Sequence, residues 1–433
     1  MDGSGTRRRL SVAALTRVEG EGGMKVQIRD GRVEQVNLNI YEPPRFFEAL
    51  LVGRDYREPP DLTARICGIC PVAYQMSACL AIEDACGVVV DGSLAQLRRL
   101  LYCGEWISSH ALHLHMLHAP DFLGYSGIVD MASDHPEAAD RGFQLKRVGN
   151  EIMKLLGGRA IHPVNVRLGG FYRLPSRASL EVLAQKLRRA RDGAEATVRW
   201  VAGFDFPEFE PPQEQVSMST GDEYPILRGT VISTGGIDVP ASQFEQWFTE
   251  EQVPHSTALH SRLRGGGHYL MGPVPRYNLN RHLLSPVARQ AAQEAGLGEG
   301  CRNPFQSIVV RAVEILYACD EALRLIEAYE APDRPYVDVE PVEATGYAFT
   351  EAPRGTLYHR YRIGADGLIT QACIVPPTSQ NQGQIEDDLR LLVQQRLAMP
   401  AVELTQMCER AIRNYDPCIS CASHFLRLRL VHR

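Results

Sequence analysis

The sequence predicts a mainly α-helical fold of the α+β class, a bundle of long helices with small β-sheet elements at its margins. Apolar residues recur at helical spacing over four long windows, 71–86, 93–118, 179–203 and 305–329. Close to the two ends of the chain, apolar and polar residues alternate instead, as they do in β-strands. The middle of the protein is therefore predicted to be helical.

Two Asp-Gly pairs predict β-hairpins in the alternating segments. Asp30-Gly31 stands between alternating residues near the N-terminus, and Asp366-Gly367 stands within the alternating segment 356–375. Asp-Gly suits a two-residue hairpin turn because both residues tolerate positive φ. We expect an N-terminal β element within residues 1–45 and a β-hairpin region within 335–380.

Three further helices are predicted nearer the C-terminus. Ser285-Pro286 combines a capping hydroxyl with a proline at the first helical position, where the missing N–H costs nothing. Helices at 384–397 and 401–414 then lead to a C-terminal Asp-Pro-Cys. No repeat or long linker separates the elements, so we expect one domain over 1–433. Its helical core is placed at 65–330, and its C-terminal helices and a cysteine motif at 384–424.

Composition and charge exclude several classes of protein. The 433 residues are 44% hydrophobic and 23% charged, which is typical of a globular chain. The net charge of -6 offers no basic field for nucleic acid. The sequence contains no run of 18 apolar residues, so we predict no membrane span. Arg7, Arg8 and Arg9 precede alternating residues instead of an apolar signal segment. We expect a cytoplasmic protein.

Four of the eleven cysteines form two C-x-x-C pairs, Cys67 with Cys70 and Cys418 with Cys421. An odd number of cysteines without an export signal favours reduced thiols, and the seven scattered ones are expected to be small buried apolar residues. Gly68 permits the tight turn that lets two sulfurs of one pair face the same point. Each pair is thus half of a four-thiolate metal site.

The cysteine pairs alone leave two other interpretations open. A structural zinc site uses such pairs, although zinc ribbons bring them together from about 15 to 20 residues apart. Here they come from opposite ends of the chain. A redox dithiol would explain one pair and not the second.

The flanks of both pairs resemble the signatures of nickel-iron hydrogenase large subunits, R-x-C-G-x-C at 65–70 and D-P-C-x-x-C-x-x-H at 416–424. Four more segments match the family in the same order, at 16–20, 45–48, 351–355 and 375–378. The resemblance spans nearly the whole chain. It implies the large-subunit fold of that family and reversible, heterolytic cleavage of H2 to protons and electrons.

The resemblance implies a nickel-iron centre bound by all four thiolates. Cys67 and Cys418 would be terminal nickel ligands, while Cys70 and Cys421 would bridge to an iron that carries carbon monoxide and cyanide. Soft thiolates suit both metals. A terminal thiolate is the nearest base for the proton released from H2, and we expect Cys418 to be catalytic.

Three further residues are expected around the metals. Glu19 resembles the family's proton-relay glutamate, which takes the proton from a terminal cysteine. Arg354 resembles the arginine whose guanidinium lies over the open metal site. Thr378 resembles the residue that hydrogen-bonds a cyanide, although Pro377 replaces the family's usual hydroxyl residue before it. Without the resemblance, Glu19 would be interpreted as a surface acid and Arg354 as part of an ordinary salt bridge.

A second metal position is implied by Glu48 and His424. In the family, matching residues hold a magnesium or related ion near the C-terminus, although an imidazole is an untypical ligand for so hard an ion. The segment 425–433 resembles the extension that the family removes after nickel insertion. Maturation would then involve a protease and nickel-insertion proteins.

Two departures from the family pattern, Tyr74 and Ser109, indicate its cytoplasmic, cofactor-coupled branch, which is linked to NAD(P) or deazaflavin. A histidine cluster follows Ser109 closely. At helical spacing its members do not share one face, so packing and surface roles are predicted for them. The four histidines are His110, His113, His115 and His118.

The electrons must leave through other chains. The remaining cysteines lack iron-sulfur spacing, and Arg264-Gly265-Gly266-Gly267 is neither a dinucleotide fingerprint nor a P-loop. We expect a heteromeric complex with an iron-sulfur small subunit and with flavin- and NAD(P)-binding subunits. Three alternatives stay open, namely a relative of the quinone-site subunit of complex I, a hydrogen sensor and a structural zinc protein. The complex I lineage lacks the four cysteines.

Overall fold

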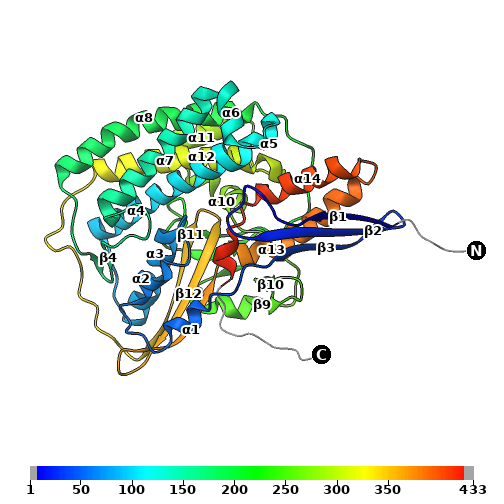
Figure 1. The fold of residues 1–433 in the computed structure, drawn as a ribbon. Coiled ribbons are helices and arrows are strands. Elements are labelled where there is room, and N and C mark those ends of the chain that lie inside the picture. Colours follow the sequence, from blue (N-terminus) through cyan, green and yellow to red (C-terminus); the bar gives the residue numbers. More distant parts are fainter. Residues whose placement is uncertain (1–6, 424–433) are drawn as a thin grey trace, which may run out of the picture.

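Four long helices dominate the upper part of the computed structural model, which describes residues 7–423 (Figure 1). α4 packs against α7 and α12, and α12 packs against α8. Three of these helices fall in the predicted windows, which confirms the helical core. Their bounds are α4 Gly92–Ala111, α7 Pro136–Gly157, α8 Arg177–Ala202 and α12 Ser307–Glu327.

The sequence windows did not single out α7, because glycine replaces part of its apolar stripe. A Cβ on Gly149 would lie 2.5 Å from the Gly104 carbonyl oxygen, and one on Gly142 would lie 2.5 Å from the His115 ring. The two helix backbones of α4 and α7 therefore approach closely. Such contacts bury helix surface without the large side chains that a periodicity search detects.

The predicted helix at 93–118 changes its winding before its end. α4 stops at Ala111, and Leu112–His118 continues as a π-helical segment that leads into α5 (Ala119–Leu123). π-helical segments are often found at functional sites. This one carries three of the four clustered histidines.

α3 (Pro71–Ala85) begins directly after Cys70 and is capped by another helix. Glu105 of α4 accepts hydrogen bonds from the backbone nitrogens of Val72 at 2.6 Å and Ala73 at 3.1 Å. A carboxylate at a helix N-terminus satisfies otherwise unpaired N–H groups and complements the helix dipole. The start of α3, and with it Cys70, is thereby fixed against α4.

The N-terminal sheet confirms the first predicted hairpin. Its antiparallel order is β1-β2-β3, and Asp30 and Gly31 both have positive φ in the β2–β3 turn. α13 packs against β3 and α14 against β1. The bounds are β1 Arg7–Val12, β2 Gly22–Arg29, β3 Arg32–Ile40, α13 Pro377–Gln395 and α14 Ala401–Asn414.

A second antiparallel sheet, β11-β12-β13, runs diagonally beside α3 in Figure 1. Its β12–β13 hairpin turns near Gly367, as predicted, and β11 is added on the side of α3. The tight β11–β12 connection is Pro353-Arg354. The strands are β11 Ala344–Ala352, β12 Gly355–Ile363 and β13 Ile369–Val375.

Short strands also interrupt the segment 65–330, for which the sequence predicts a helical core. They contain only two to five residues each, too few for alternation to be recognised. They are β4 Val166–Arg167, β5 Gly170–Phe171, β6 Val216–Ser219, β7 Thr230–Ser233, β8 Asp238–Val239, β9 Phe248–Gln252 and β10 Leu259–Leu263.

The remaining helices are short. α11 starts as predicted, with the Ser285 hydroxyl accepting a hydrogen bond from the Ala288 backbone nitrogen. Within residues 7–423, no helix combines the length and apolar character that crossing a membrane requires. The short helices are α1 Phe47–Leu51, α2 Pro59–Thr63, α6 Ile128–Asp134, α9 Phe244–Trp247, α10 Pro273–Asn280 and α11 Pro286–Glu294.

We predict that Gly346→Ala strongly destabilises the fold. A Cβ there would lie 2.0 Å from the Ala81 carbonyl oxygen and 2.3 Å from the Ala85 nitrogen, so β11 would have to move away from α3. Overpacking of this kind costs about 1–3 kcal/mol. Thermal unfolding measures the effect. Gly267→Ala is the control, since nothing lies within 4 Å of its added Cβ, and equal unfolding temperatures for the two variants would contradict the prediction.

Candidate metal centre

The structure brings the two cysteine pairs together at one buried point. The sulfur atoms of Cys67 and Cys418 are 3.4 Å apart, and those of Cys70 and Cys421 are 3.5 Å apart. All four sulfurs lie within 4.8 Å of one another, and each residue is at most 4% exposed. Four thiols from positions about 350 residues apart thus form a single cluster.

Local structure fixes each pair. The Cys67 sulfur accepts hydrogen bonds from the backbone nitrogens of Ile69 and Cys70, which closes the first turn. The second pair frames the 3-10 turn Ile419–Ala422, and the Ile419 nitrogen donates to the Glu19 carbonyl oxygen at 3.0 Å. A β-bridge between Glu19 and Cys418 therefore ties the C-terminal pair to the N-terminal segment.

The cluster fits soft metal ions. Metal–sulfur bonds of about 2.3 Å place neighbouring thiolates roughly 3.3–3.8 Å apart in a four-thiolate site. The two separations between the pairs fall in that range. The thiolate set alone would suit nickel, iron or zinc.

A small cavity lies beside one side of the cluster. Cys70, Cys418 and Cys421 line it, whereas Cys67 does not. Its other walls include Arg354, Pro377 and Thr378, together with Tyr74, whose hydroxyl is 3.4 Å from the Cys421 carbonyl oxygen. The site is therefore asymmetric, with the cavity on the side of Cys70, Cys418 and Cys421.

Glu19 lies against the terminal cysteine of the second pair. Its Oε2 atom is 3.1 Å from the Cys418 sulfur and accepts a hydrogen bond from the Ser420 nitrogen at 3.1 Å. Its side chain is half-buried. A carboxylate in this position can exchange a proton directly with the Cys418 sulfur.

Arg354 is held over the cavity by two neighbours. Its guanidinium donates to the carbonyl oxygen of Asp416 at 2.9 Å, to the carboxylate of Asp416 at 3.1 Å and to the Ser109 hydroxyl at 3.2 Å. Burial disfavours its charge, but Asp416 and the nearby cysteine thiolates outweigh burial and raise the Arg354 pKa well above its usual value. Arg354 thus forms a salt bridge with Asp416 and also lines the cavity.

Thr378 is placed by the backbone of the second pair. Its Oγ1 accepts a hydrogen bond from the Cys418 nitrogen at 3.1 Å, which leaves the hydroxyl hydrogen available for a ligand in the cavity. Pro377 lines the same cavity and offers no donor there.

The expected second metal position is only partly described. Glu48 is buried on α1, and its Oε1 accepts a hydrogen bond from the Ile374 nitrogen at 2.7 Å. Burial and the neighbouring Glu48 charge raise the pKa of Glu250 to about 8. His424 and the segment 425–433 lie outside the described residues. Sequence analysis missed Glu250, which sits in a short strand without a recognisable motif.

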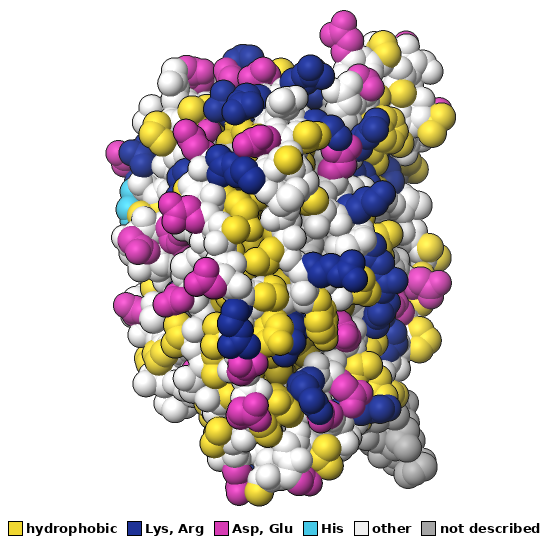
Figure 2. Space-filling model, turned by 90° about the vertical axis from the view of Figure 1, so that its left-hand side faces the viewer, with side chains coloured by type: hydrophobic (Ala, Val, Ile, Leu, Met, Phe, Trp, Pro, Cys, Tyr) yellow, Lys and Arg dark blue, Asp and Glu magenta, His cyan; other side chains and the backbone are white. Residues whose placement is uncertain are grey.

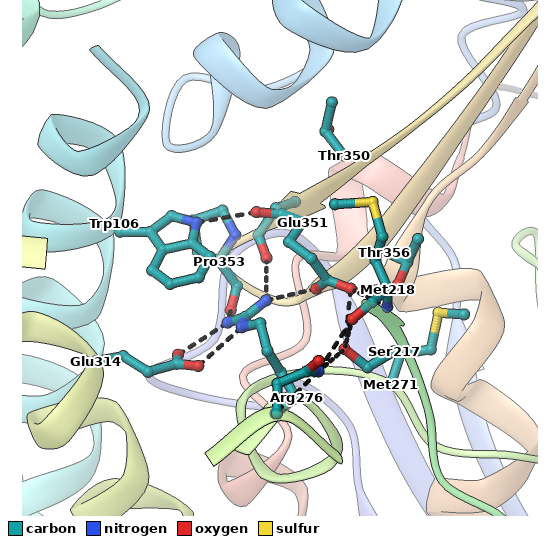
Figure 3. Close-up of polar contacts among 12 residues, drawn as sticks. Trp106, Ser217, Met218, Met271, Arg276, Glu314, Thr350, Glu351, Pro353 and Thr356 are labelled. Carbon is teal, nitrogen blue, oxygen red and sulfur yellow. Dashed lines mark hydrogen bonds and ion pairs between the residues drawn. The ribbon is translucent and has the colours of Figure 1, made fainter. Parts of the chain in front are cut away.

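A buried ionic network supports the turn that carries Arg354 (Figure 3). The Arg276 guanidinium contacts both carboxylate oxygens of Glu314 at 2.8 Å and one of Glu351 at 2.6 Å. It also donates to the carbonyl oxygens of Ala352 and Pro353 and lies 4.2 Å from the centre of the Trp106 ring.

Arg276 is the cation that faces both buried carboxylates of this network. Burial opposes ionisation of Glu314, but Arg276 outweighs it and lowers the Glu314 pKa to about 2. His110 also lies 2.9 Å from the Glu314 carboxylate. Sequence analysis missed Arg276 and Glu314, although an acid within the apolar α12 window was a visible signal.

The four clustered histidines are all buried, so the surface role predicted for some of them is wrong. The Nε2 atom of His113 hydrogen-bonds the Arg413 carbonyl oxygen at 2.9 Å, and that of His118 the Asn414 side chain at 3.0 Å. His115 stacks on Trp200. The packing role is the one that the structure shows, because His113 and His118 face the end of α14 and His115 faces α8.

Comparison with known proteins identifies the family. A family model described as nickel-dependent hydrogenase matches residues 45–141 and 303–424, about half of the chain. The sulfhydrogenase 1 subunit alpha of Pyrococcus furiosus is 34% identical over 97% of this chain and 98% of that protein. The chain belongs to the nickel-dependent hydrogenase family.

A second relative and a solved structure support the assignment to this hydrogenase family. The sulfhydrogenase 2 subunit alpha of Pyrococcus furiosus is 35% identical over 97% of this chain and 100% of that protein. A crystal structure of an NAD+-reducing [NiFe]-hydrogenase superposes with a TM-score of 0.87, at 27% identity, over 97% of this chain and 100% of the matched chain. These matches confirm the predicted large-subunit fold and the resemblance from which it was inferred.

We predict that Arg276→Met destabilises this hydrogenase chain severely. The substitution leaves Glu314 and Glu351 buried without their cation, and breaking a buried ion pair in this way costs about 3–5 kcal/mol. Thermal unfolding measures the loss. Arg334→Met removes an exposed ion pair with Asp338 and is the control with little expected change. Similar unfolding temperatures for both variants would contradict the role of the network.

Proposed function

We propose that this chain is the catalytic subunit of a nickel-iron hydrogenase and cleaves H2 reversibly to protons and electrons. The observation that carries the proposal is the convergence of four buried cysteine sulfurs beside a cavity lined by Arg354. Membership of the nickel-dependent hydrogenase family supports nickel over zinc at these thiolates. It also weighs against the complex I lineage, in which the four cysteines are lost.

The asymmetry of the site separates Cys67 from the other three cysteines, which all line the cavity. Cys70 and Cys421 line the cavity, as ligands that bridge nickel to an iron with carbon monoxide and cyanide would. Cys67, which does not line the cavity, and Cys418, which does, would be the terminal nickel ligands. The metal pair supplies the soft, electron-rich centre at which the H–H bond is split.

Protons leave through Cys418 and Glu19. The Cys418 thiolate is the base nearest the reacting centre and holds the proton at its sulfur. Glu19 accepts it across 3.1 Å, and the Ser420 nitrogen keeps the carboxylate oriented for that transfer. Because Glu19 is half-buried, it connects the buried cluster to the protein exterior.

Arg354 and Thr378 prepare the cavity for its ligands. Arg354 is a fixed cation whose position does not have to change during the reaction, since Asp416 and Ser109 hold it. The Thr378 hydroxyl is a donor for a cyanide ligand, while Pro377 provides none. We further propose that Glu48 and His424 hold magnesium or a related ion and that the chain forms one domain.

Partner chains are needed to carry electrons away from the metal centre. Electrons pass to an iron-sulfur small subunit and from there to flavin and NAD(P) subunits. This proposal is supported by the similar fold of an NAD+-reducing hydrogenase and by relatives named as alpha subunits. Figure 2 shows hydrophobic side chains along one face, with Lys and Arg beside them, a composition suited to contact with another chain.

We further propose where the complex acts and how it matures. The complex is cytoplasmic, nickel-insertion proteins load the centre, and a protease removes 425–433. Tyr74 and Ser109 favour the branch coupled to NAD(P) or deazaflavin. Both residues lie beside the cavity, at the Cys421 carbonyl and at Arg354 respectively.

Replacing any one of the four ligands with serine should abolish hydrogen uptake by the complete complex. A hydroxyl is a poor ligand for nickel and low-spin iron, so bound nickel and iron should fall as well. Hydrogen uptake and metal analysis measure the two effects. Cys301→Ser is the control, a buried cysteine outside the cluster, and should keep both. Full uptake in any ligand variant would refute the proposal.

Glu19→Gln should separate proton transfer from metal binding. The amide preserves shape and the hydrogen bond from Ser420 but cannot take a proton, so hydrogen uptake should fall at least ~100-fold. Nickel and iron content should remain that of the parent enzyme. Glu21→Gln, at an exposed carboxylate two residues away, should behave like the parent. A Glu19→Gln enzyme with unchanged turnover would eliminate Glu19 as the relay.

A further inference from the structure

A second group of metal-ligating side chains lies outside the four-cysteine cluster. His255, His260 and Glu386 each offer one ligand atom, and these three atoms lie within 4.8 Å of one another. His255 is in the connection between β9 and β10, His260 is in β10, and Glu386 is on α13. Three separate segments therefore converge on this point, which the hydrogenase chemistry does not use.

The hydrogen bonding of the group leaves ligand capacity unused. His255 Nε2 is 2.8 Å from Glu386 Oε1, and the same oxygen accepts a hydrogen bond from the Leu38 nitrogen at 2.7 Å. His260 is 2% exposed, and among residues 7–423 its Nε2 atom has no hydrogen-bond partner. A buried polar atom without a partner is costly, which indicates that a ligand is missing from its surroundings.

We propose that His255, His260 and Glu386 bind a divalent transition-metal ion, for which zinc is the best match. Two imidazoles and one carboxylate are a common three-ligand set for zinc, with a water molecule in the fourth position. The side chains of His255 and Glu386 are 22% and 14% exposed, so water can reach that position. This site is independent of the proposed hydrogenase function.

Only a small adjustment is needed for coordination. Zinc bonds of about 2.0–2.2 Å place tetrahedral ligand atoms roughly 3.3–3.5 Å apart. Side-chain rotations must therefore open the 2.8 Å contact of His255 with Glu386 and close the wider separations. Burial lowers the pKa of His260 to about 4, so its imidazole is neutral at pH 7 and can donate a lone pair. The His255 and His260 rings are nearly perpendicular, with their centres 5.5 Å apart.

The charges around the group favour a dication. Glu386 is the anion among the three ligands. Arg262 lies near His260, is paired with Glu251 at 2.9 Å and donates to His268. His268 in turn hydrogen-bonds the Asp387 carboxylate at 2.6 Å. Glu386, Glu251 and Asp387 thus place three carboxylates with Arg262 in this part of the structure.

A bound ion would join elements that approach the catalytic cluster. The connection that carries His255 also holds Thr257, which donates hydrogen bonds to the carbonyl oxygen of Ile40, the last residue of β3. α13, which carries Glu386, begins at Pro377-Thr378 beside Cys418. The ion would thus fasten the N-terminal sheet, the β9–β10 hairpin and α13 together, at a distance from the reacting atoms.

Zinc binding to the complete complex, with its native centre already filled, tests the proposal. Protein treated with a chelator is titrated with zinc against a competing indicator of known affinity, and the zinc X-ray absorption spectrum is recorded. The parent should bind one zinc with nitrogen and oxygen ligands. His255→Gln and His260→Gln should each weaken binding by at least ~100-fold, because removing a ligand exceeds the 10–100-fold effect of an outer-shell partner. Hydrogen uptake should stay unchanged in both.

Controls make the outcome decisive. His282→Gln, at an exposed histidine, should bind zinc like the parent. If His260→Gln does not fold, His255→Gln still gives the comparison because its side chain is partly exposed. The proposal is overturned if the parent binds no zinc, if a folded histidine variant binds zinc as tightly as the parent, or if the spectrum shows sulfur ligands.

Discussion

The meeting of four thiols at one buried point is the constraint on which the rest of the structure depends. Cys67 and Cys70 precede α3, whereas Cys418 and Cys421 follow α14, so the fold must bring two distant segments into register. The Glu105 cap holds the first pair, and the bridge to Glu19 holds the second. Small displacements of either support would separate sulfurs that are now 3.4 Å apart.

Buried ion pairs hold the residues around the cluster in place. Arg354 and Arg276 are both buried cations, and each is balanced by carboxylates instead of water. Burying such groups is costly unless all of them are paired. The pairing fixes positions: Arg276 holds the carbonyl groups on either side of Pro353, and Arg354 is thereby presented to the cavity. Precision at the site is obtained through a polar core rather than through apolar packing alone.

Local signals in the sequence were sufficient to predict much of the fold and the cysteine cluster. The hairpin at Asp30-Gly31 and the helix start at Ser285 needed only neighbouring residues. α7 was missed because its contacts use Gly142 and Gly149. The Arg276 network and the pairing of Arg354 with Asp416 depend on long-range geometry, which no local pattern encodes. Glu19 was found through family motifs, and its contact with Cys418 became visible only in three dimensions.

The most direct measurement of the central claim is metal analysis of the purified complex combined with infrared spectroscopy. If the four thiolates hold a nickel-iron pair, the protein contains nickel bound by sulfur and shows bands from carbon monoxide and cyanide on iron. Those bands disappear when Cys70 or Cys421 is replaced by serine. Zinc as the metal at the four thiolates, with no such bands in protein grown with ample nickel, would contradict the account.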